Sequence, residues 1–181
     1  AGIVAKHLSA AGADVTFSTI LGEDDLKSYV LDDLKSFGVK VLPIIDNSRP
    51  TTNKNVFIAS SYRLLKVDTL DNRPITRGLL EKLLLQVRDV KADIVVFSDF
   101  RHGVFSKYSI DELTSAIPDG VFKVADSQVA SRWGNITEFK GFDLITPNER
   151  EARFALADQD STIGQLSAAV VKEAKPKNLI L

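Results

Sequence analysis

The sequence predicts an α/β protein in which helices cover both faces of a mostly parallel sheet. Strand-like and helical patterns alternate along most of the 181 residues, as they do in chains built from repeated βα units. The strands are short, continuous apolar runs such as "ADIVVF", a pattern typical of strands buried on both faces. The alternation breaks only over residues 46–71, which predicts an insertion of a different kind.

The first third of the chain alternates cleanly. Apolar residues at helical spacing predict an opening helix that ends at Gly12, where a C-cap glycine is expected. A strand is expected over residues 15–21, followed by a helix that ends at Gly38. The next strand, "VKVLPII", contains Pro43, which indicates an edge strand or a bend.

Residues 46–71 read as a hairpin. Two strand-like runs, "NVFIAS" and "YRLLKVD", are separated by a Ser-Ser step with no helix between them, so antiparallel pairing is expected. The βα alternation then resumes. The expected elements are a helix over 76–90, the strand "ADIVVF", a helix over 107–116, the strand "VFKVAD", the run "FDLIT", a helix opened by "PNERE", a helix over 162–174 and a terminal strand. We expect residues 1–181 to form a single domain that carries this insertion.

The composition excludes several classes of function. A net charge of -1 with interspersed signs gives no footprint for nucleic acid or an anionic membrane. No apolar run approaches the roughly 20 residues that span a bilayer, and no signal-peptide pattern opens the chain. The absence of cysteine excludes disulfides, thiolate zinc sites and cysteine nucleophiles. We therefore expect a cytoplasmic protein.

Because the chain lacks methionine and both ends fall inside structural patterns, we expect it to be incomplete at both ends.

Polar residues follow four of the expected strands. The strand ends deliver "GEDD", "SDFRHG", "DSQ" and "PNERE". In open α/β sheets, ligands bind in the crevice beyond the carboxyl ends of the strands. The order of elements therefore predicts a ligand site at this edge of the sheet, without naming the ligand.

The stretch "TPNERE" has two interpretations. Thr146, Pro147 and Glu149 match a capping box, with Thr146 as the N-cap, a proline at the first helical position and a glutamate at the third. Asn148 and Glu151 lie three residues apart, so in a helix they share a face. Near a positively polarised helix start, this pair could organise a hydrated magnesium ion and its phosphates; the alternative is a solvated helix face.

The stretch "SDFRHGVFS" is the second candidate. Arg101 and His102 could contact a phosphate, Gly103 allows a sharp turn, and Asp99 could orient a hydroxyl; the alternative is an ordinary polar loop. Trp133 could stack on a base or a sugar, or cover a hydrophobic edge. There is no Walker A sequence, no GxGxxG and no nucleophile elbow, so a P-loop, a Rossmann cofactor site and a serine triad are not expected.

In this order, the motifs resemble those of the PfkB (ribokinase-like) carbohydrate kinases. The stretch "AGIVAKHLSAAGADVTFSTILGED" is similar to the N-terminal signature of the family, and "RPTTNKNVFIA" followed by "LLKVD" is similar to its lid strands. "DFRHGVFS" resembles the Asp-Tyr-x-Lys-Gly-x-x-Ser segment of the heptose kinase branch, and "LITPNERE" resembles the Pro-Asn-x-x-Glu motif. The resemblance implies a ribokinase-like three-layer α/β/α fold with a mostly parallel central sheet and a small β lid.

The resemblance also implies an activity. It implies an ATP-dependent kinase that uses Mg²⁺ and phosphorylates a sugar or sugar phosphate. The branch that the chain most resembles is the heptose 7-phosphate kinase domain of bifunctional ADP-heptose synthase. Residues 46–71 would form the lid over the sugar and would pair two subunits in a homodimer. The implied substrate-binding residues are Gly22, Asp24, Lys54, Asp99 and His102. The implied nucleotide and metal residues are Asn148 and Glu151.

The chain also departs from the family pattern. Ile3 stands where the signature usually has a sugar-contacting Asn, Val56 where heptose kinases commonly have a lid Arg, and His102 replaces the usual Lys. The catalytic Asp of the family belongs to a Gly-Ala-Gly-Asp segment that these 181 residues do not include, so we assign no catalytic base. The alternative to a kinase is a truncated or degenerate module that binds a sugar or a partner without catalysis. A generic doubly wound nucleotide-binding domain is a third possibility, but it leaves the hairpin unexplained.

Overall fold

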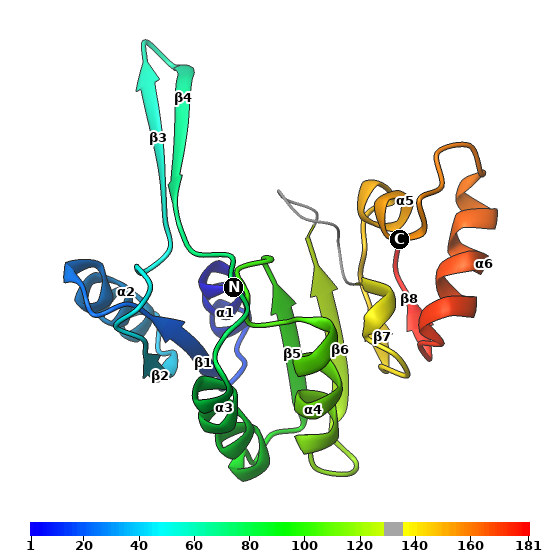
Figure 1. The fold of residues 1–181 in the computed structure, drawn as a ribbon, viewed down its shortest axis with the longest axis horizontal. Helices are drawn as coiled ribbons and strands as arrows, with labels where there is room; N and C mark the ends of the chain where they lie inside the picture. Colours follow the sequence, from blue (N-terminus) through cyan, green and yellow to red (C-terminus); the bar gives the residue numbers. More distant parts are fainter. Residues whose placement is uncertain (129–135) are drawn as a thin grey trace. The chain divides into compact units, whose positions relative to one another are not determined.

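The computed structural model describes residues 1–128 and 136–181, so Trp133 lies outside the described residues. The chain divides into two compact units, which are described separately. Unit 1 comprises Ala1–Arg73 and Arg77–Leu83, and unit 2 comprises Pro74–Thr76 and Leu84–Leu181 (Figure 1). No helix among the described residues is long and apolar enough to cross a membrane.

Unit 1 contains the first βα alternation that the sequence predicts. Its elements up to the hairpin are α1 (Gly2–Ala10), β1 (Thr16–Leu21), α2 (Asp25–Ser36) and β2 (Lys40–Ile45). Strands β1 and β2 pair in parallel, and Ala5, Leu34 and Val39 form a small buried core. Gly12 and Gly38 follow α1 and α2 with φ values of 96° and 75°, a conformation that glycine adopts without strain. Both predicted helix ends are therefore confirmed.

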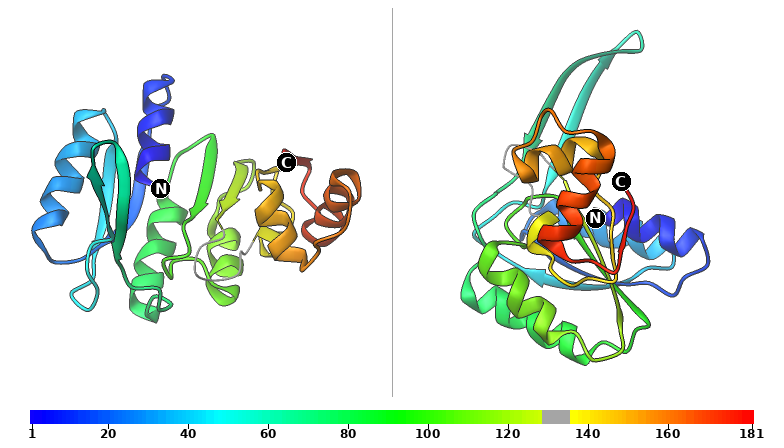
Figure 2. Two further views of the ribbon diagram at one scale, coloured as in Figure 1. Left: turned by 90° about the horizontal axis from the view of Figure 1, so that it is seen from above. Right: turned by 90° about the vertical axis from the view of Figure 1, so that its right-hand side faces the viewer.

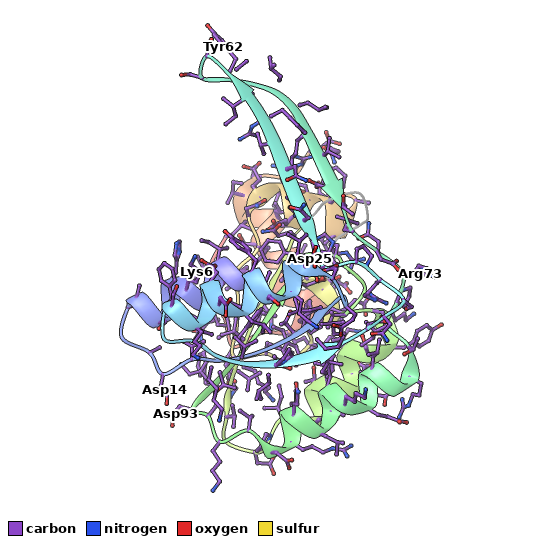
Figure 3. All side chains as sticks on the ribbon, turned by 90° about the vertical axis from the view of Figure 1, so that its left-hand side faces the viewer. Lys6, Asp14, Asp25, Tyr62, Arg73 and Asp93 are labelled. Carbon is purple, nitrogen blue, oxygen red and sulfur yellow. The ribbon has the colours of Figure 1, made fainter. Side chains whose placement is uncertain are left out.

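The predicted hairpin is confirmed as well. Strands β3 (Asn53–Ala59) and β4 (Tyr62–Thr69) pair antiparallel and extend away from the helices of their own unit (Figures 1 and 3). Every residue of the two strands except Asn53 is exposed. Since an isolated two-stranded hairpin is only marginally stable in water, these strands depend on their turn, their base and any surface that covers them.

The two faces of the hairpin differ in chemistry. Residues directly opposite one another in an antiparallel pair lie on the same face, and successive residues alternate. The apolar face carries Phe57 opposite Leu65, with Val67 two residues further along β4. The charged face carries two cross-strand pairs, Lys54 with Asp68 and Val56 with Lys66. Lys66 also forms an ion pair with Asp68 at 3.1 Å on this face.

The turn of the hairpin supports a first prediction. Ser60 and Ser61 both have positive φ values, 46° and 70°, a conformation that costs a non-glycine residue roughly 1–2 kcal/mol. We expect Ser61→Gly to stabilise the hairpin by about 1 kcal/mol, because glycine occupies this region without the steric cost. Amide hydrogen exchange of β3 and β4 measures the effect as increased protection. Unchanged or reduced protection would contradict the strain at this position.

Unit 2 holds the second run of βα units. Helix α3 (Arg77–Asp89) begins in unit 1 and ends in unit 2. The elements that follow are β5 (Ile94–Asp99), α4 (Lys107–Ala116), β6 (Phe122–Ser127), η1 (Ile136–Glu138), β7 (Leu144–Ile145), α5 (Glu149–Leu156), α6 (Ile163–Ala174) and β8 (Asn178–Leu179). The four strands form one parallel sheet in the order β5-β6-β7-β8, and α5 packs against α6 (Figure 2).

The core of unit 2 supports the carboxyl ends of its strands. The rings of Phe97, Phe105, Phe139 and Phe142 contact one another, with centroids 5.1–6.3 Å apart in tilted and edge-to-face arrangements. Ala125 of β6 and Ile145 of β7 are completely buried. The ends of β5, β6 and β7 are therefore anchored in a buried core.

Candidate active site

The turn between β1 and α2 carries two of the predicted sugar-binding residues. Asp24 is the N-cap of α2: its Oδ1 accepts a hydrogen bond from the Lys27 amide at 3.2 Å. Its Oδ2 accepts one from the Thr51 amide at 2.7 Å, and the Gly22 amide donates to Thr51 Oγ1 at 3.0 Å. The bond from the Thr51 amide is the main reason why the pKa of Asp24 lies below its usual value. Asp24 therefore presents a carboxylate whose two oxygens are already oriented.

Gly22 is required by its surroundings. A Cβ atom at this position would lie 2.6 Å from both the Arg49 carbonyl oxygen and the Thr51 amide nitrogen, and 2.8 Å from Asp24 Oδ2. Two of these atoms are backbone and cannot rotate away. The third predicted residue of this unit, Lys54, is the second residue of β3 and lies on the charged face of the hairpin.

In unit 2, Asp99 organises the loop after β5. Its side chain is 1% exposed, and its Oδ1 accepts a hydrogen bond from the Arg101 amide at 2.7 Å. Its Oδ2 accepts bonds from Arg101 Nη1 at 3.2 Å and from Ser127 Oγ at 2.9 Å. Burial raises the pKa of Asp99, and the contacts with Arg101 and Ser127 oppose that rise. The role predicted for Asp99, orienting a substrate hydroxyl, stays a prediction.

Arg101 is held in a strained backbone conformation by these contacts. Its φ is 63°, which is uncommon for a residue with a side chain, and its side chain is 12% exposed beside Asp99. Gly103 has a φ of 85°, which confirms the sharp turn expected there. His102 lies between these two residues and is partly buried. Strain of this kind is often retained at functional sites.

The start of α5 corrects one interpretation of the sequence. The N-cap is Asn148, not Thr146, and the capping box joins Asn148 to Glu151 rather than Thr146 to Glu149. The Glu151 amide donates to Asn148 Oδ1 at 3.0 Å, and the Asn148 amide donates to Glu151 Oε2 at 2.8 Å. Glu149 instead forms an exposed ion pair with Arg153. Asn148 and Glu151, the two residues predicted to hold the metal, are therefore held in place by hydrogen bonds to each other.

Asp126 is a further candidate site residue that the sequence motifs did not single out. It lies in β6, next to the carboxyl end, and burial raises its pKa. Its charge also raises the pKa values of Asp99 and Glu151, which places it near both carboxyl groups. The only signal in the sequence was its position in the strand end "DSQ". The sheet brings Asp126 toward Glu151 because β6 and β7 are neighbours.

These residues suit a hydrated divalent cation. Glu151 is 8% exposed, and burial is the main reason why its pKa is raised, with the charge of Asp126 adding to the rise. A bound cation would relieve this excess of negative charge. No group of three or more acidic or histidine side chains close enough to enclose a metal occurs in the part of the chain that is described. The arrangement fits Mg²⁺, which commonly binds through one or two carboxylates, waters and phosphates.

A shallow pocket lies beside these groups. It has a volume of about 350 Å³ and is lined by Asn148, Glu149, Arg150, Arg153, Phe154 and Gln159. The guanidinium of Arg150 lies 5.5 Å from the centre of the Phe154 ring. The pocket therefore offers positive charge next to the α5 N-terminus, where the helix dipole also favours anions.

The interaction between the carboxyl groups of Asp126 and Glu151 supports a second prediction. We expect Asp126→Asn to lower the pKa of Glu151, because the substitution removes a neighbouring negative charge. In the wild type, the folded pKa of Glu151 exceeds its unfolded value, so the free energy of unfolding falls as pH rises through that interval. In Asp126→Asn, the decrease of the unfolding free energy with rising pH should be smaller. Carbon-detected NMR titration of the Glu151 carboxyl measures the shift.

The matched control is Asp119→Asn. Asp119 is exposed and precedes the opposite end of β6, so its removal should leave the Glu151 titration unchanged. Equal midpoints for Glu151 in the wild type and in Asp126→Asn would show that the two carboxyl groups are not coupled.

Comparison with known proteins identifies the family. The model of the pfkB family carbohydrate kinases matches residues 3–181. The bifunctional protein HldE of Sulfurimonas denitrificans is 30% identical over 183 residues, which is 99% of this chain and 38% of the relative. HldE of Helicobacter hepaticus is 28% identical over 88% of this chain and 34% of the relative. The chain therefore spans little more than a third of the length of these curated relatives.

Solved structures confirm the fold. The tetrameric inhibited form of phosphofructokinase-2 from Escherichia coli matches 98% of this chain and 59% of its own, with a TM-score of 0.75 and 16% identity. Ribokinase from Giardia lamblia matches 96% of this chain and 56% of its own, with a TM-score of 0.66 and 17% identity. The ribokinase-like three-layer α/β/α class predicted from the sequence is thus confirmed. Together with the family match over residues 3–181, this establishes that the chain belongs to the pfkB family of carbohydrate kinases.

Proposed function

We propose that this chain belongs to a kinase that transfers the γ-phosphoryl group of ATP to a hydroxyl of a sugar or sugar phosphate. The observation that carries the proposal is the match of the carbohydrate kinase family to residues 3–181. It is supported by Asn148 and Glu151, the family's Asn-x-x-Glu pair, which are joined in a cap next to Asp126. The motif and its geometry therefore point to the same chemistry.

The proposed roles divide between the two units. In unit 2, Asn148 and Glu151, with Asp126 nearby, would hold Mg²⁺ and orient the phosphates of ATP. When bound, Mg²⁺ would neutralise the charge that develops on the phosphates during transfer. The helix start and the guanidinium of Arg150 add positive potential for the same phosphates. Arg101 and His102 would contact a phosphate.

In unit 1, Gly22 and Asp24 would contact the acceptor hydroxyls, and Lys54 would contact an anionic group of the acceptor. Asp24 suits this role because its carboxylate is ionised and held by Thr51. The hairpin would act as a lid that excludes water, which otherwise competes with the sugar for the phosphoryl group. We assign the base that deprotonates the acceptor to none of the described residues.

The finer proposal is a heptose 7-phosphate acceptor. It is supported by the resemblance of "DFRHGVFS" to the heptose kinase segment and by the HldE relatives at about 30% identity. Lys54 on the charged face of the hairpin is consistent with a phosphorylated sugar. The apolar face, with Phe57, Leu65 and Val67 exposed, supports a homodimer that pairs through the hairpins.

The test is phosphoryl transfer from ATP with Mg²⁺, using the full-length parent protein and a panel of sugars and sugar phosphates that includes heptose 7-phosphate. We expect turnover with one acceptor and its loss in the double variant Asn148→Ala, Glu151→Ala. Binding of a sugar without turnover of any acceptor would overturn the proposal in favour of a non-catalytic binding module. The departures at Ile3, Val56 and His102 make that the appropriate alternative.

A further inference from the structure

The base of the hairpin consists of residues 46–51, which lead into β3, and residues 71–73, which follow β4. Each segment contains an ion pair. Arg49 Nε donates to Asp46 Oδ2 at 2.6 Å, and both side chains are less than 10% exposed. Arg73 donates to Asp71 Oδ1 through Nε at 3.1 Å and to Asp71 Oδ2 through Nη2 at 2.6 Å, a bidentate contact. Each segment is therefore cross-linked by its own ion pair.

Arg73 also joins the two segments. Its Nη2 donates to the Ser48 carbonyl oxygen at 3.3 Å, on the opposite side of the base. The charges interact across the base as well, because Arg49 contributes to the low pKa of Asp71, which is about 2, after the larger effect of Arg73 itself. The hydrogen bond from Arg73 to Ser48 is therefore a side-chain contact that spans the base.

The base is also joined to the turn that carries Gly22 and Asp24. The Thr51 amide donates to Asp24 Oδ2, and Thr51 Oγ1 accepts from the Gly22 amide. The backbone of Arg49 and Thr51 approaches Gly22 so closely that a Cβ atom would not fit. A rotation of the base must therefore disturb this turn, or be resisted by it.

Packing does little to fix the direction of the strands, because the residues of β4 and all those of β3 after Asn53 are exposed. A strand extends roughly 3.3 Å per residue, so a rotation of about 10° at the base moves Lys54 by roughly 1 Å. In phosphoryl transfer, a misplacement of about 1 Å can reduce the rate by a large factor.

From these contacts we propose that Arg73 is a positioning residue for acceptor binding, because it fixes the angle of the hairpin relative to the turn of Gly22 and Asp24. The inference rests on the proposed function, in which these two residues and Lys54 contact the acceptor. Arg73 itself touches no reacting group. Its side chain is 70% exposed, so its replacement should alter the angle of the hairpin with little effect on folding.

The experiment compares Arg73→Gln with Arg77→Gln in the full-length parent protein. Arg77 is a matched control, because it is an exposed arginine that forms an ion pair with Glu81 within α3. For Arg73→Gln we expect the KM of the acceptor to rise about fivefold, with the KM of ATP unchanged. We also expect a larger fraction of ATP to be hydrolysed without transfer. Arg73→Lys keeps the positive charge but lacks the two-pronged guanidinium, so its acceptor KM should lie between those of the wild type and Arg73→Gln.

A second readout requires no activity. Amide hydrogen exchange at Thr51 reports the bond to Asp24, and we expect faster exchange in Arg73→Gln than in Arg77→Gln. Equal exchange at Thr51 in the two variants would overturn the inference, as would an unchanged KM of the acceptor. If the wild type phosphorylates no acceptor, the proposed function fails, and the exchange comparison alone decides whether Arg73 holds the base.

Discussion

Replacing Glu151 with glutamine should abolish most phosphoryl transfer while leaving the fold intact. Glutamine keeps an oxygen that can accept the bond from the Asn148 amide, so the capping box survives. The substitution removes the negative charge that we propose holds Mg²⁺. Since charge stabilisation dominates phosphoryl transfer, we expect kcat to fall by about 100-fold or more. Steady-state kinetics at saturating ATP and acceptor measure the loss.

The control for this variant is Glu173→Gln on α6. Glu173 is exposed and does not line the pocket beside Asn148, so kcat should stay within about twofold of the wild type. Thermal unfolding should show that Glu151→Gln is at least as stable as the wild type, because a buried charge with a raised pKa is removed. Equal kcat values in the two variants would contradict the metal-side role of Glu151.

Replacing Gly22 with alanine should cause a large loss of stability. The new Cβ would lie 2.6 Å from two backbone atoms, those of Arg49 and Thr51, so the base of the hairpin must move. Overpacking of this kind costs about 1–3 kcal/mol of unfolding free energy. Denaturant unfolding measures the change, and loss of protection at the Thr51 amide locates it.

Gly78→Ala provides the comparison. Gly78 lies within α3, and nothing lies within 4 Å of its Cβ position, so alanine should stabilise the helix by about 0.5–1 kcal/mol. The two substitutions add the same methyl group and should have opposite signs. If Gly22→Ala were as stable as Gly78→Ala, the close approach of the base to the turn would be refuted.

The order of the main helices and strands could be predicted from the sequence, but the exact start of α5 could not. Two capping patterns overlap in "TPNERE", one beginning at Thr146 and the other at Asn148. The sheet selects the second, because the Thr146 amide donates to the Ala125 carbonyl oxygen and thereby extends the strand pairing. The residue before a proline also favours an extended backbone. Local sequence preferences carry no information about the hydrogen bond between Thr146 and Ala125. They could therefore not decide whether the helix is capped by Thr146 or by Asn148.

The candidate site was partly predictable for a similar reason. Asn148 and Glu151 were found because their spacing is local, whereas the proximity of Asp126 to Glu151 depends on the order of strands β6 and β7. The hairpin was predictable from alternation, but the contact of Arg73 with Ser48 joins residues 25 positions apart. Long-range contacts of this kind leave no periodic signal in the sequence.

The most direct test of the central claim is the fate of the γ-phosphoryl group. Full-length protein, Mg²⁺ and γ-labelled ATP are incubated with the sugar and sugar-phosphate panel, and the label is located by mass spectrometry. We expect label in one acceptor with the wild type and with Glu173→Gln, and almost none with Glu151→Gln. Label found only in inorganic phosphate, or retained entirely in ATP by the wild type, would contradict the assignment of this chain as a sugar kinase.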